Sequence, residues 1–500
     1  MRVSELWWRL PLAIVGGLIA LYTFPTENVW ILAPLIPALI LLATLGMNFW
    51  GAYLVGFVAG QAFYISHIEW ISLYLGPVPL LALSTLMSLY FALGVAVTAW
   101  LWKKLKPKAS HYFGFAFIAA GIWTTREYLA INFPYGGFPW SRLAMTQAYG
   151  PLANWSFWGG LSLLSFAIAL LGALIAMVIF SLKAKRVNRI PYAIAAACIA
   201  LIPVATPTTL FNPAVGSKVV AAVQGNAKAG LFANHTPGAI LQNHLDASEL
   251  IFESELADQV ELVVWPENAS DVDPLRSDAA RAKIEAFSDR IGAPFTFGTI
   301  TKRGDETFNS TLLWEPGVGP VDYYDKKRPV PFAEYVPDRE FWRMLAPDLI
   351  DLVPRGYSFG VRDGIFDTNG LASGSLICFE IAVDDIPRGL ALEGAQLILS
   401  QTNNADFGYS DETYQQAAIA KLRAIETGRT VVNISTVGLS AIFLPTGETL
   451  AELPWYEPGA MVEKVPLHSG LTPALVLAGW IDLLILALTL AFIGLRWSRR

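Results

Sequence analysis

The sequence predicts two kinds of structure in one chain: a multi-span α-helical membrane domain and an α/β domain. Hydrophobic residues make up 54% of the 500 residues and charged residues only 15%, too little charge to cover a soluble protein of this length. The chain also contains 17 Trp, a residue enriched where membrane meets water. One long polar stretch, residues 208–470, alternates strand-like and helical segments, which is typical of an α/β sheet with helices on its faces.

Seven apolar segments precede the polar stretch and one follows it, and we interpret each as a membrane span. They lie near residues 10–24, 29–46, 50–70, 77–102, 112–130, 157–182, 190–207 and 471–495. The predicted organisation is therefore a transmembrane domain (1–207), a polar domain (208–470), and a C-terminal span with a short basic tail (471–500).

Basic residues give the orientation of these spans. They cluster in four places: Arg2 and Arg9; Lys103, Lys104, Lys106 and Lys108; Lys183, Lys185, Arg186 and Arg189; and Arg496, Arg499 and Arg500. With seven spans before the polar domain and one after, all four clusters fall on one side, which the positive-inside rule makes cytoplasmic. We expect a plasma-membrane protein with both termini in the cytoplasm and an extracytoplasmic polar domain.

Charge and cysteine content exclude several classes of protein. A net charge of −6 argues against nucleic acid as a partner. Cys198 lies in an apolar run and Cys378 in the polar domain, so we expect no disulfide between them. No Cys/His cluster has the spacing of a zinc site, and no cofactor motif is evident.

Within the polar domain, strand-like and helical segments alternate. The predicted strands are 218–226, 261–268, 294–300, 310–316, 374–380, 395–404 and 430–438. The predicted amphipathic helices are 238–257, 278–291 and 411–428.

Cys378 ends the strand-like segment GSLICFE and is the lone cysteine of the polar domain. Such a residue is often simply a small buried hydrophobe. A free thiol outside the cytoplasm is nevertheless a liability unless it is used, and a nucleophilic thiol needs a neighbouring base or cation. Glu380 lies two positions further on and is expected to share the face of an extended strand with Cys378.

Two other segments supply charged groups for such a site. Glu267 follows ELVVWP, where Pro266 ends the strand and leaves the carboxylate at its carboxyl end, the edge at which α/β active sites gather. Lys326 and Glu334 lie in YYDKKRPVPFAEYVP, whose prolines and aromatic residues favour a rigid, partly buried loop. Taken singly, Glu267 fits an ordinary residue of a surface loop better, and a charged surface loop is the alternative for the segment of Lys326 and Glu334.

In their order along the chain, these motifs resemble the nitrilase superfamily, whose catalytic residues are Glu, Lys and Cys. The matching features are Pro-Glu after a strand, Tyr-x-Lys followed by Pro-Phe-x-Glu, Cys-x-Glu, and the helical Arg423-Ala424-Ile425-Glu426. Such a domain between seven spans and one resembles the apolipoprotein N-acyltransferase family, as does Gly-Phe-Pro-Trp at 137–140. The segment 401–440 is most similar to actinobacterial members.

The resemblance implies an αββα sandwich whose catalytic residues are Glu267, Lys326 and Cys378, supported by Glu334, Phe379 and Glu380. It implies transfer of an acyl chain from a phospholipid, through a thioester on Cys378, to the α-amine of the diacylglyceryl-cysteine of a lipoprotein. We expect a monomer that works at the lipid bilayer without cofactor or metal.

Two departures from the family pattern concern the mouth of the site. The usual Leu-Val-Pro-Phe-Gly-Glu is Pro-Val-Pro-Phe-Ala-Glu at 329–334, and Asn-Asp-Ala-Trp-Phe-Gly is Asn-Asn-Ala-Asp-Phe-Gly at 403–408. Neither change removes a catalytic side chain, but both bear on lipid preference. The apolar residues of REFWRMLAPDLIDL, from 339, fit either a lid in the headgroup region or a helix packed on the domain core.

Other interpretations remain open. A membrane-tethered amidase that hydrolyses a small amide would carry the same three residues, although eight spans exceed what a tether needs. A transporter or lipid-binding protein with an inactive domain is a third, weakened by the intact Glu, Lys and Cys. Arg126 and Glu127, near the end of a predicted span, serve either function or anchoring, and we assign them to no catalytic role.

Overall fold

The computed structural model describes residues 3–182, 189–204, 212–228, 236–353 and 356–497. The chain divides into two compact units, Met1–Pro207 with Val476–Arg500, and Thr208–Leu475. Several basic residues that set the predicted orientation lie outside the described residues, namely Arg2, Lys183, Lys185, Arg186, Arg499 and Arg500. The predicted boundary at 207/208 lies outside them as well.

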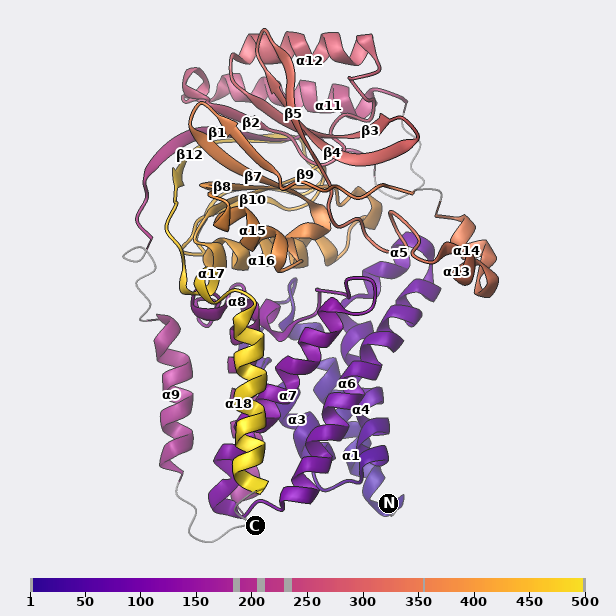
Figure 1. Cartoon of the computed structure of the whole chain (residues 1–500), viewed down its shortest axis with the longest axis vertical. Coiled ribbons are helices and arrows are strands. Elements are labelled where there is room, and N and C mark those ends of the chain that lie inside the picture. The colour runs from indigo at the N-terminus through magenta and orange to yellow at the C-terminus, as the bar shows by residue number, and fades with distance from the viewer. Residues whose placement is uncertain (1–2, 183–188, 205–211, 229–235, 354–355, 498–500) are drawn as a thin grey trace. The chain divides into compact units, whose positions relative to one another are not determined.

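The described residues of the first unit form helices joined by turns and loops (Figure 1). Its helices are α1 (Val3–Leu18), α2 (Ala20–Thr23), α3 (Leu35–Thr44), α4 (Phe49–His67), α5 (Ser72–Leu75), α6 (Pro77–Leu105), α7 (Tyr112–Asn132), α8 (Trp155–Ser181), α9 (Ile190–Val204) and α18 (Trp480–Trp497). Each predicted span thus coincides with a helix, although the last begins later than expected because α17 (Pro473–Leu477) is separate. Among the described residues, three helical segments are long and apolar enough to cross a membrane: Leu6–Thr23, Pro77–Leu105 and Trp155–Ser181. Eight spans remains a prediction.

Arg126 and Glu127 are buried inside this helical unit and hold its parts together. The Glu127 carboxylate accepts hydrogen bonds from Trp123 Nε1 at 2.9 Å and from the backbone N–H of Leu143 at 3.1 Å, which ties the segment after α7 to that helix. The Arg126 guanidinium donates to the hydroxyl of Tyr64 at 3.0 Å and lies over the Trp123 ring. These contacts give the pair a structural role in packing the helices.

The second unit contains two six-stranded sheets. The first has the order β12-β1-β2-β3-β4-β5 and the second β11-β10-β9-β8-β7-β6. The strands of the first are β1 (Gly216–Gln224), β2 (Leu262–Val264), β3 (Phe295–Arg303), β4 (Glu306–Glu315), β5 (Gly319–Asp325) and β12 (Gly459–Leu467). Those of the second are β6 (Ile365–Thr368), β7 (Leu371–Ile377), β8 (Leu397–Thr402), β9 (Thr430–Ser435), β10 (Ser440–Phe443) and β11 (Thr449–Leu453). The central strands β1, β2 and β3 are parallel, as are β7, β8 and β9.

The sheets pack face to face between two layers of helices (Figure 1). Apolar residues of both sheets meet in one core, which includes Val220 and Val264 from the first and Leu399 and Val432 from the second. A second core joins the outer face of the first sheet to α11 (Ala239–Ser248) and α12 (Asp278–Ile291). The helices α15 (Asp385–Leu392) and α16 (Glu412–Thr427) cover the second sheet. The predicted αββα sandwich is confirmed.

Two predictions about local structure are wrong. The predicted helix 238–257 ends at Ser248 and continues as 3₁₀ turns. The predicted strand 374–380 ends at Ile377, where a 3₁₀ turn, η7 (Cys378–Ile381), begins. Cys378 and Glu380 therefore do not share the face of an extended strand.

The segment REFWRMLAPDLIDL forms two short helices, α13 (Arg339–Leu345) and α14 (Pro347–Asp351). The side chains of Phe341, Met344 and Leu345 are 50%, 76% and 66% exposed. Packing of this apolar face on the domain core, one of the two alternatives, is therefore wrong for these three residues.

Candidate active site

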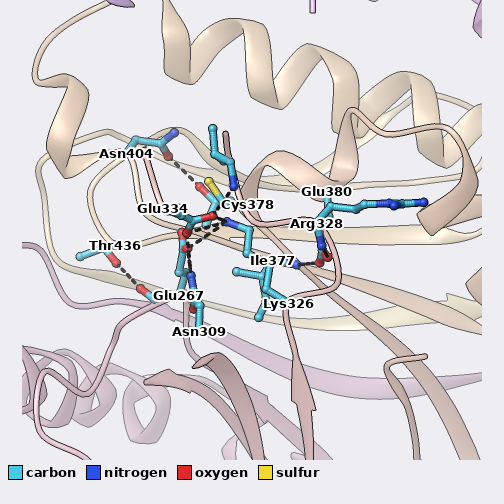
Figure 2. A network of polar contacts seen from close by, with 12 residues as sticks. Glu267, Asn309, Lys326, Arg328, Glu334, Ile377, Cys378, Glu380, Asn404 and Thr436 are labelled. Atoms are coloured by element: carbon cyan, nitrogen blue, oxygen red, sulfur yellow. Dashed lines mark hydrogen bonds and ion pairs between the residues drawn. The ribbon is translucent and has the colours of Figure 1, made fainter. Parts of the chain in front are cut away.

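The Lys326 ammonium lies between two carboxylates in the interior of the sandwich. Its side chain is only 1% exposed. Nζ is 2.9 Å from Glu334 Oε2 and 3.6 Å from Glu267 Oε1. Figure 2 shows these three side chains gathered beside Cys378. The structure thus brings together the three predicted catalytic residues and the predicted supporting residue Glu334.

The main chain at Glu267 is fixed from two sides. Glu267 follows β2, and its carbonyl oxygen accepts a hydrogen bond from Thr436 Oγ1 at 3.0 Å. On the neighbouring strand β3, the N–H of Gly298 donates to the Pro266 carbonyl at 3.0 Å. A Cβ at Gly298 would lie only 2.5 Å from Glu267 Cα, so the close approach of these strands requires glycine.

Lys326 and Glu334 are positioned by the chain that follows β5. The backbone N–H of Lys326 donates to the Asn309 carbonyl of β4 at 2.9 Å. The turn after it is closed by Glu334, whose Oε2 accepts from the N–H of Val330 at 2.7 Å and whose own N–H donates to the Val330 carbonyl at 2.9 Å. The expectation of a partly buried loop is confirmed.

Asn309 joins the two carboxylates and was not predicted from the sequence. Its Nδ2 donates to Glu267 Oε1 at 2.7 Å and to Glu334 Oε1 at 3.1 Å. The sequence feature that could have indicated Asn309 is its position as a polar residue next to a strongly apolar strand. The predicted strand began at residue 310, so Asn309 was not included in it.

Cys378 occupies the first position of η7, with a φ of 54°. Residues other than glycine rarely adopt this left-handed region, and such strain gathers at functional sites. The turn is held by Glu380, whose carboxylate accepts from the N–H groups of Ile377 at 2.8 Å and Arg328 at 2.9 Å. It also accepts from the Tyr324 hydroxyl at 2.9 Å. Glu380 thus supports the turn that carries Cys378 rather than facing the sulfur.

The predicted Arg-Ala-x-Glu helix is α16, and its Arg423 side chain hydrogen-bonds to the end of the turn η7. Arg423 Nε donates to the Ile381 carbonyl at 2.9 Å and Nη2 to the Ala382 carbonyl at 2.7 Å. Glu426 pairs with Arg423 and accepts from Arg388 Nε at 2.9 Å. Phe379, predicted as a supporting residue, lies in η7 beside Cys378 and is partly exposed.

The electrostatics of the cluster place the resting proton on the sulfur. Burial raises the pKa of the Cys378 thiol well above its ordinary value, and the Glu267 carboxylate raises it further. Burial also raises the pKa of Glu267, although the Lys326 ammonium opposes that rise. Burial alone would lower the pKa of Lys326, but the carboxylates of Glu334 and Glu267 outweigh it and hold that pKa above its ordinary value. The site therefore contains a permanent cation, a neutral thiol and a carboxylate able to take its proton.

Comparisons with known proteins cover nearly the whole chain. The family model for the apolipoprotein N-acyltransferase N-terminal domain matches residues 16–174, and the carbon-nitrogen hydrolase model matches residues 219–470. The apolipoprotein N-acyltransferase of Mycolicibacterium smegmatis is 32% identical over 93% of this chain and 81% of that protein. That of Azotobacter vinelandii is 30% identical over 94% of this chain and 91% of that protein. The crystal structure of an amidase from Nesterenkonia sp. aligns with a TM-score of 0.39 and 20% identity, over 52% of this chain and 93% of that chain.

The close approach at Gly298 gives a stability prediction. Gly298→Ala should lower the unfolding temperature of the purified protein, because overpacking a buried strand costs about 1–3 kcal/mol. Gly216→Ala is the matched control, since its Cβ would meet nothing within 4 Å. Thermal unfolding in detergent measures both variants. Equal unfolding temperatures would contradict the packing described here.

Proposed function

The chain belongs to the apolipoprotein N-acyltransferase family, and from that premise we propose that Cys378 carries an acyl group between a phospholipid and the N-terminal amine of a lipoprotein. The family establishes an acyltransferase whose acceptor is a lipoprotein. The observation that carries the residue assignment is the cluster of Glu267, Lys326 and Cys378, in which a thiol, a base and a buried cation meet.

The first half-reaction forms the thioester. Glu267 accepts the proton of Cys378 as the sulfur attacks the ester carbonyl of the phospholipid. The developing oxyanion is stabilised by the Lys326 ammonium, which is worth most in a site with little water. When the tetrahedral intermediate collapses, the ester C–O bond breaks and Glu267 returns the proton to the departing lysophospholipid oxygen.

The second half-reaction consumes the thioester. The α-amine of the diacylglyceryl-cysteine attacks the thioester carbonyl, an amide bond forms, and the C–S bond breaks. Glu267 takes a proton from the amine nitrogen and passes it to the leaving sulfur, so the resting thiol is restored. Glu334 holds Lys326 in place through both steps.

An amine competes with water for the thioester only where water is scarce. The described site meets this requirement, since the side chains of Lys326 and Glu267 are 1% and 5% exposed. The helix α13 further supports the proposal that the substrates are lipids. Its apolar residues Phe341, Met344 and Leu345 are exposed and could contact acyl chains. In the sequence, α13 closely follows the loop that carries Lys326 and Glu334. A lid role for this segment is part of the proposal.

The membrane orientation is also proposed. The apolar helices and the family membership indicate that the chain is a membrane protein. The distribution of basic residues supports a multi-pass arrangement in the plasma membrane, with the α/β unit extracytoplasmic and both termini cytoplasmic. Such an orientation would bring the thiol to the compartment in which lipoprotein N-termini are exposed.

The tethered amidase is less well supported. Its three catalytic residues would be the same, but the match to the acyltransferase N-terminal domain extends over residues 16–174, well outside the α/β unit. A hydrolase acting on a small amide has no need of that region.

The proposed function is tested by mass spectrometry of the intact protein with phospholipid, before and after addition of a diacylated lipopeptide. We expect an acyl adduct on Cys378 that disappears as the N-acylated peptide forms. Cys378→Ala should form no adduct, whereas Cys198→Ala, which alters the other cysteine, should behave as the wild type. An adduct that decays only to free fatty acid would favour hydrolysis, and a wild-type protein without adduct would contradict the thioester.

Acyl-enzyme formation should depend on pH through Glu267, which must be ionised to accept the thiol proton. Because burial raises the pKa of Glu267, the rate should fall as the pH drops through that raised value, at a less acidic pH than for a free Glu side chain. The carboxylate of Glu334 also raises this pKa, so Glu334→Gln should move the midpoint to lower pH. Single-turnover acylation across acid and neutral pH measures this, with Glu261→Gln as control. A midpoint that is the same in all three proteins would contradict Glu267 as the base.

A further inference from the structure

A second group of buried polar side chains reaches the Cys378 sulfur from α16 and the end of β8. Gln416 Nε2 lies 3.6 Å from Cys378 Sγ, within hydrogen-bonding distance for sulfur. Asn404 Nδ2 donates to Gln416 Oε1 at 2.7 Å and to Glu412 Oε2 at 2.6 Å. Asn404, Glu412 and Gln416 are only 2–3% exposed. This group is distinct from Glu267, Lys326 and Glu334, and the acyl-transfer steps above do not use it.

The hydrogen bonds fix which end of each amide faces which neighbour. Ser435 Oγ accepts from the backbone N–H groups of Gly438 at 2.8 Å and Val437 at 3.4 Å, which occupies both of its lone pairs and directs its proton to Asn404 Oδ1 at 2.5 Å. The Asn404 oxygen is thereby assigned, and its amide nitrogen must face Gln416. Gln416 then uses its oxygen as the acceptor, which leaves its N–H₂ group for the sulfur.

The loop after β9 and the Thr402 side chain pack closely around this hydrogen-bonded group. A Cβ on Gly438 would lie 2.2 Å from Asn404 Oδ1, so the loop after β9 closes directly onto that oxygen. Thr402 Oγ1 lies 2.9 Å from Gln416 Oε1 and 3.0 Å from Asn404 Oδ1, so its single proton serves one of these two acceptors. Anchoring α16 to β8 would require only the contacts among Asn404, Glu412 and Gln416. The N–H₂ group that Gln416 directs at the Cys378 sulfur is an additional feature.

We propose that Gln416 is a catalytic hydrogen-bond donor to the Cys378 sulfur, and that Asn404 and Ser435 are positioning residues that lock its amide in the donating orientation. This inference rests on the proposed function, in which Cys378 is the nucleophile. The Gln416 N–H stabilises the thiolate that forms as Glu267 takes the proton, and it stabilises the same thiolate when it leaves in the second half-reaction.

Glu412 completes the group without adding much negative charge. Burial raises the pKa of Glu412 to about 8, so near neutral pH most of its carboxyl groups carry a proton and still accept from Asn404 through an oxygen. A permanently charged carboxylate at this place would oppose the thiolate. The donor therefore works in a setting that is polar but nearly neutral on this side of the sulfur.

Gln416→Glu tests the donor directly. The substitution keeps the side-chain shape and the oxygen that accepts from Asn404, but it replaces the N–H₂ group with an oxygen. A hydrogen bond to a charged group contributes enough that we expect acyl-enzyme formation to slow by roughly ten- to a hundredfold at neutral pH. The rate should recover toward the wild type as the pH rises, because the thiolate then forms without the donor.

Asn404→Asp provides an independent test that leaves Gln416 unchanged. Aspartate can accept from Ser435 and Thr402 but cannot donate to Gln416. In this variant the Gln416 amide would therefore turn its nitrogen toward the new carboxylate and away from the sulfur. We expect the same slower acylation and the same recovery at high pH. Gln415→Glu, which alters the neighbouring residue about 100° around the helix, is the control for a carboxylate introduced into α16.

The measurement is the rate of Cys378 alkylation by iodoacetamide against pH in the full-length protein, read by peptide mass spectrometry beside the acylation rate, with Cys198 alkylation as internal reference. A shift of the Cys378 profile to higher pH in Gln416→Glu and Asn404→Asp, but not in Gln415→Glu, is the expected result. Unshifted profiles, or a loss of rate that is equal at every pH, would overturn the inference. Failure of the wild type to acylate Cys378 would instead contradict the proposed function, so the two failures are distinguishable.

Discussion

A buried ammonium group needs carboxylates close by, because an isolated charge in a protein interior is strongly unfavourable. In this chain the group is Lys326, and the compensating carboxylates are Glu267 and Glu334. Asn309 hydrogen-bonds both carboxylates and keeps them near the ammonium although they repel each other. The same compensation leaves the Lys326 ammonium and the Glu267 carboxylate beside the Cys378 sulfur.

This cluster depends on a fixed distance between the two sheets, because Glu267 follows β2 of the first sheet and Cys378 follows β7 of the second. Gln401 spans the gap. Its Nε2 donates to the Trp265 carbonyl at 2.6 Å, and its Oε1 accepts from Thr311 at 3.0 Å and Ser375 at 2.9 Å. These hydrogen bonds hold the carboxyl ends of the central parallel strands of the two sheets together. On the side of α16, Gln416 contacts the Cys378 sulfur.

The sequence predicted those parts of the fold and site that depend on local pattern. Apolar runs predicted the helices of the first unit, and strands such as β1 and β8 were found because their residues are mostly apolar. Short or amphipathic strands, among them β6 and β11, lack that signal and form only when paired with neighbours. The turn at Cys378 was predicted as strand because its shape is imposed by distant partners, namely Tyr324 and Arg328, which bind Glu380 of the turn, and Arg423. Asn309 and Gln416 were not predicted as site residues for the same reason, because their contacts form only when segments distant in the sequence come together.

In the proposed mechanism, Glu267 takes the proton from Cys378 within this buried cluster. The most direct measurement is the rate of acyl adduct formation on Cys378 in Glu267→Gln with phospholipid, compared with the wild type under the same conditions. A general base contributes roughly 10²- to 10⁴-fold, so we expect the adduct rate to fall by about that factor while Cys378 remains open to alkylation at high pH. Adduct formation at the wild-type rate would contradict the account.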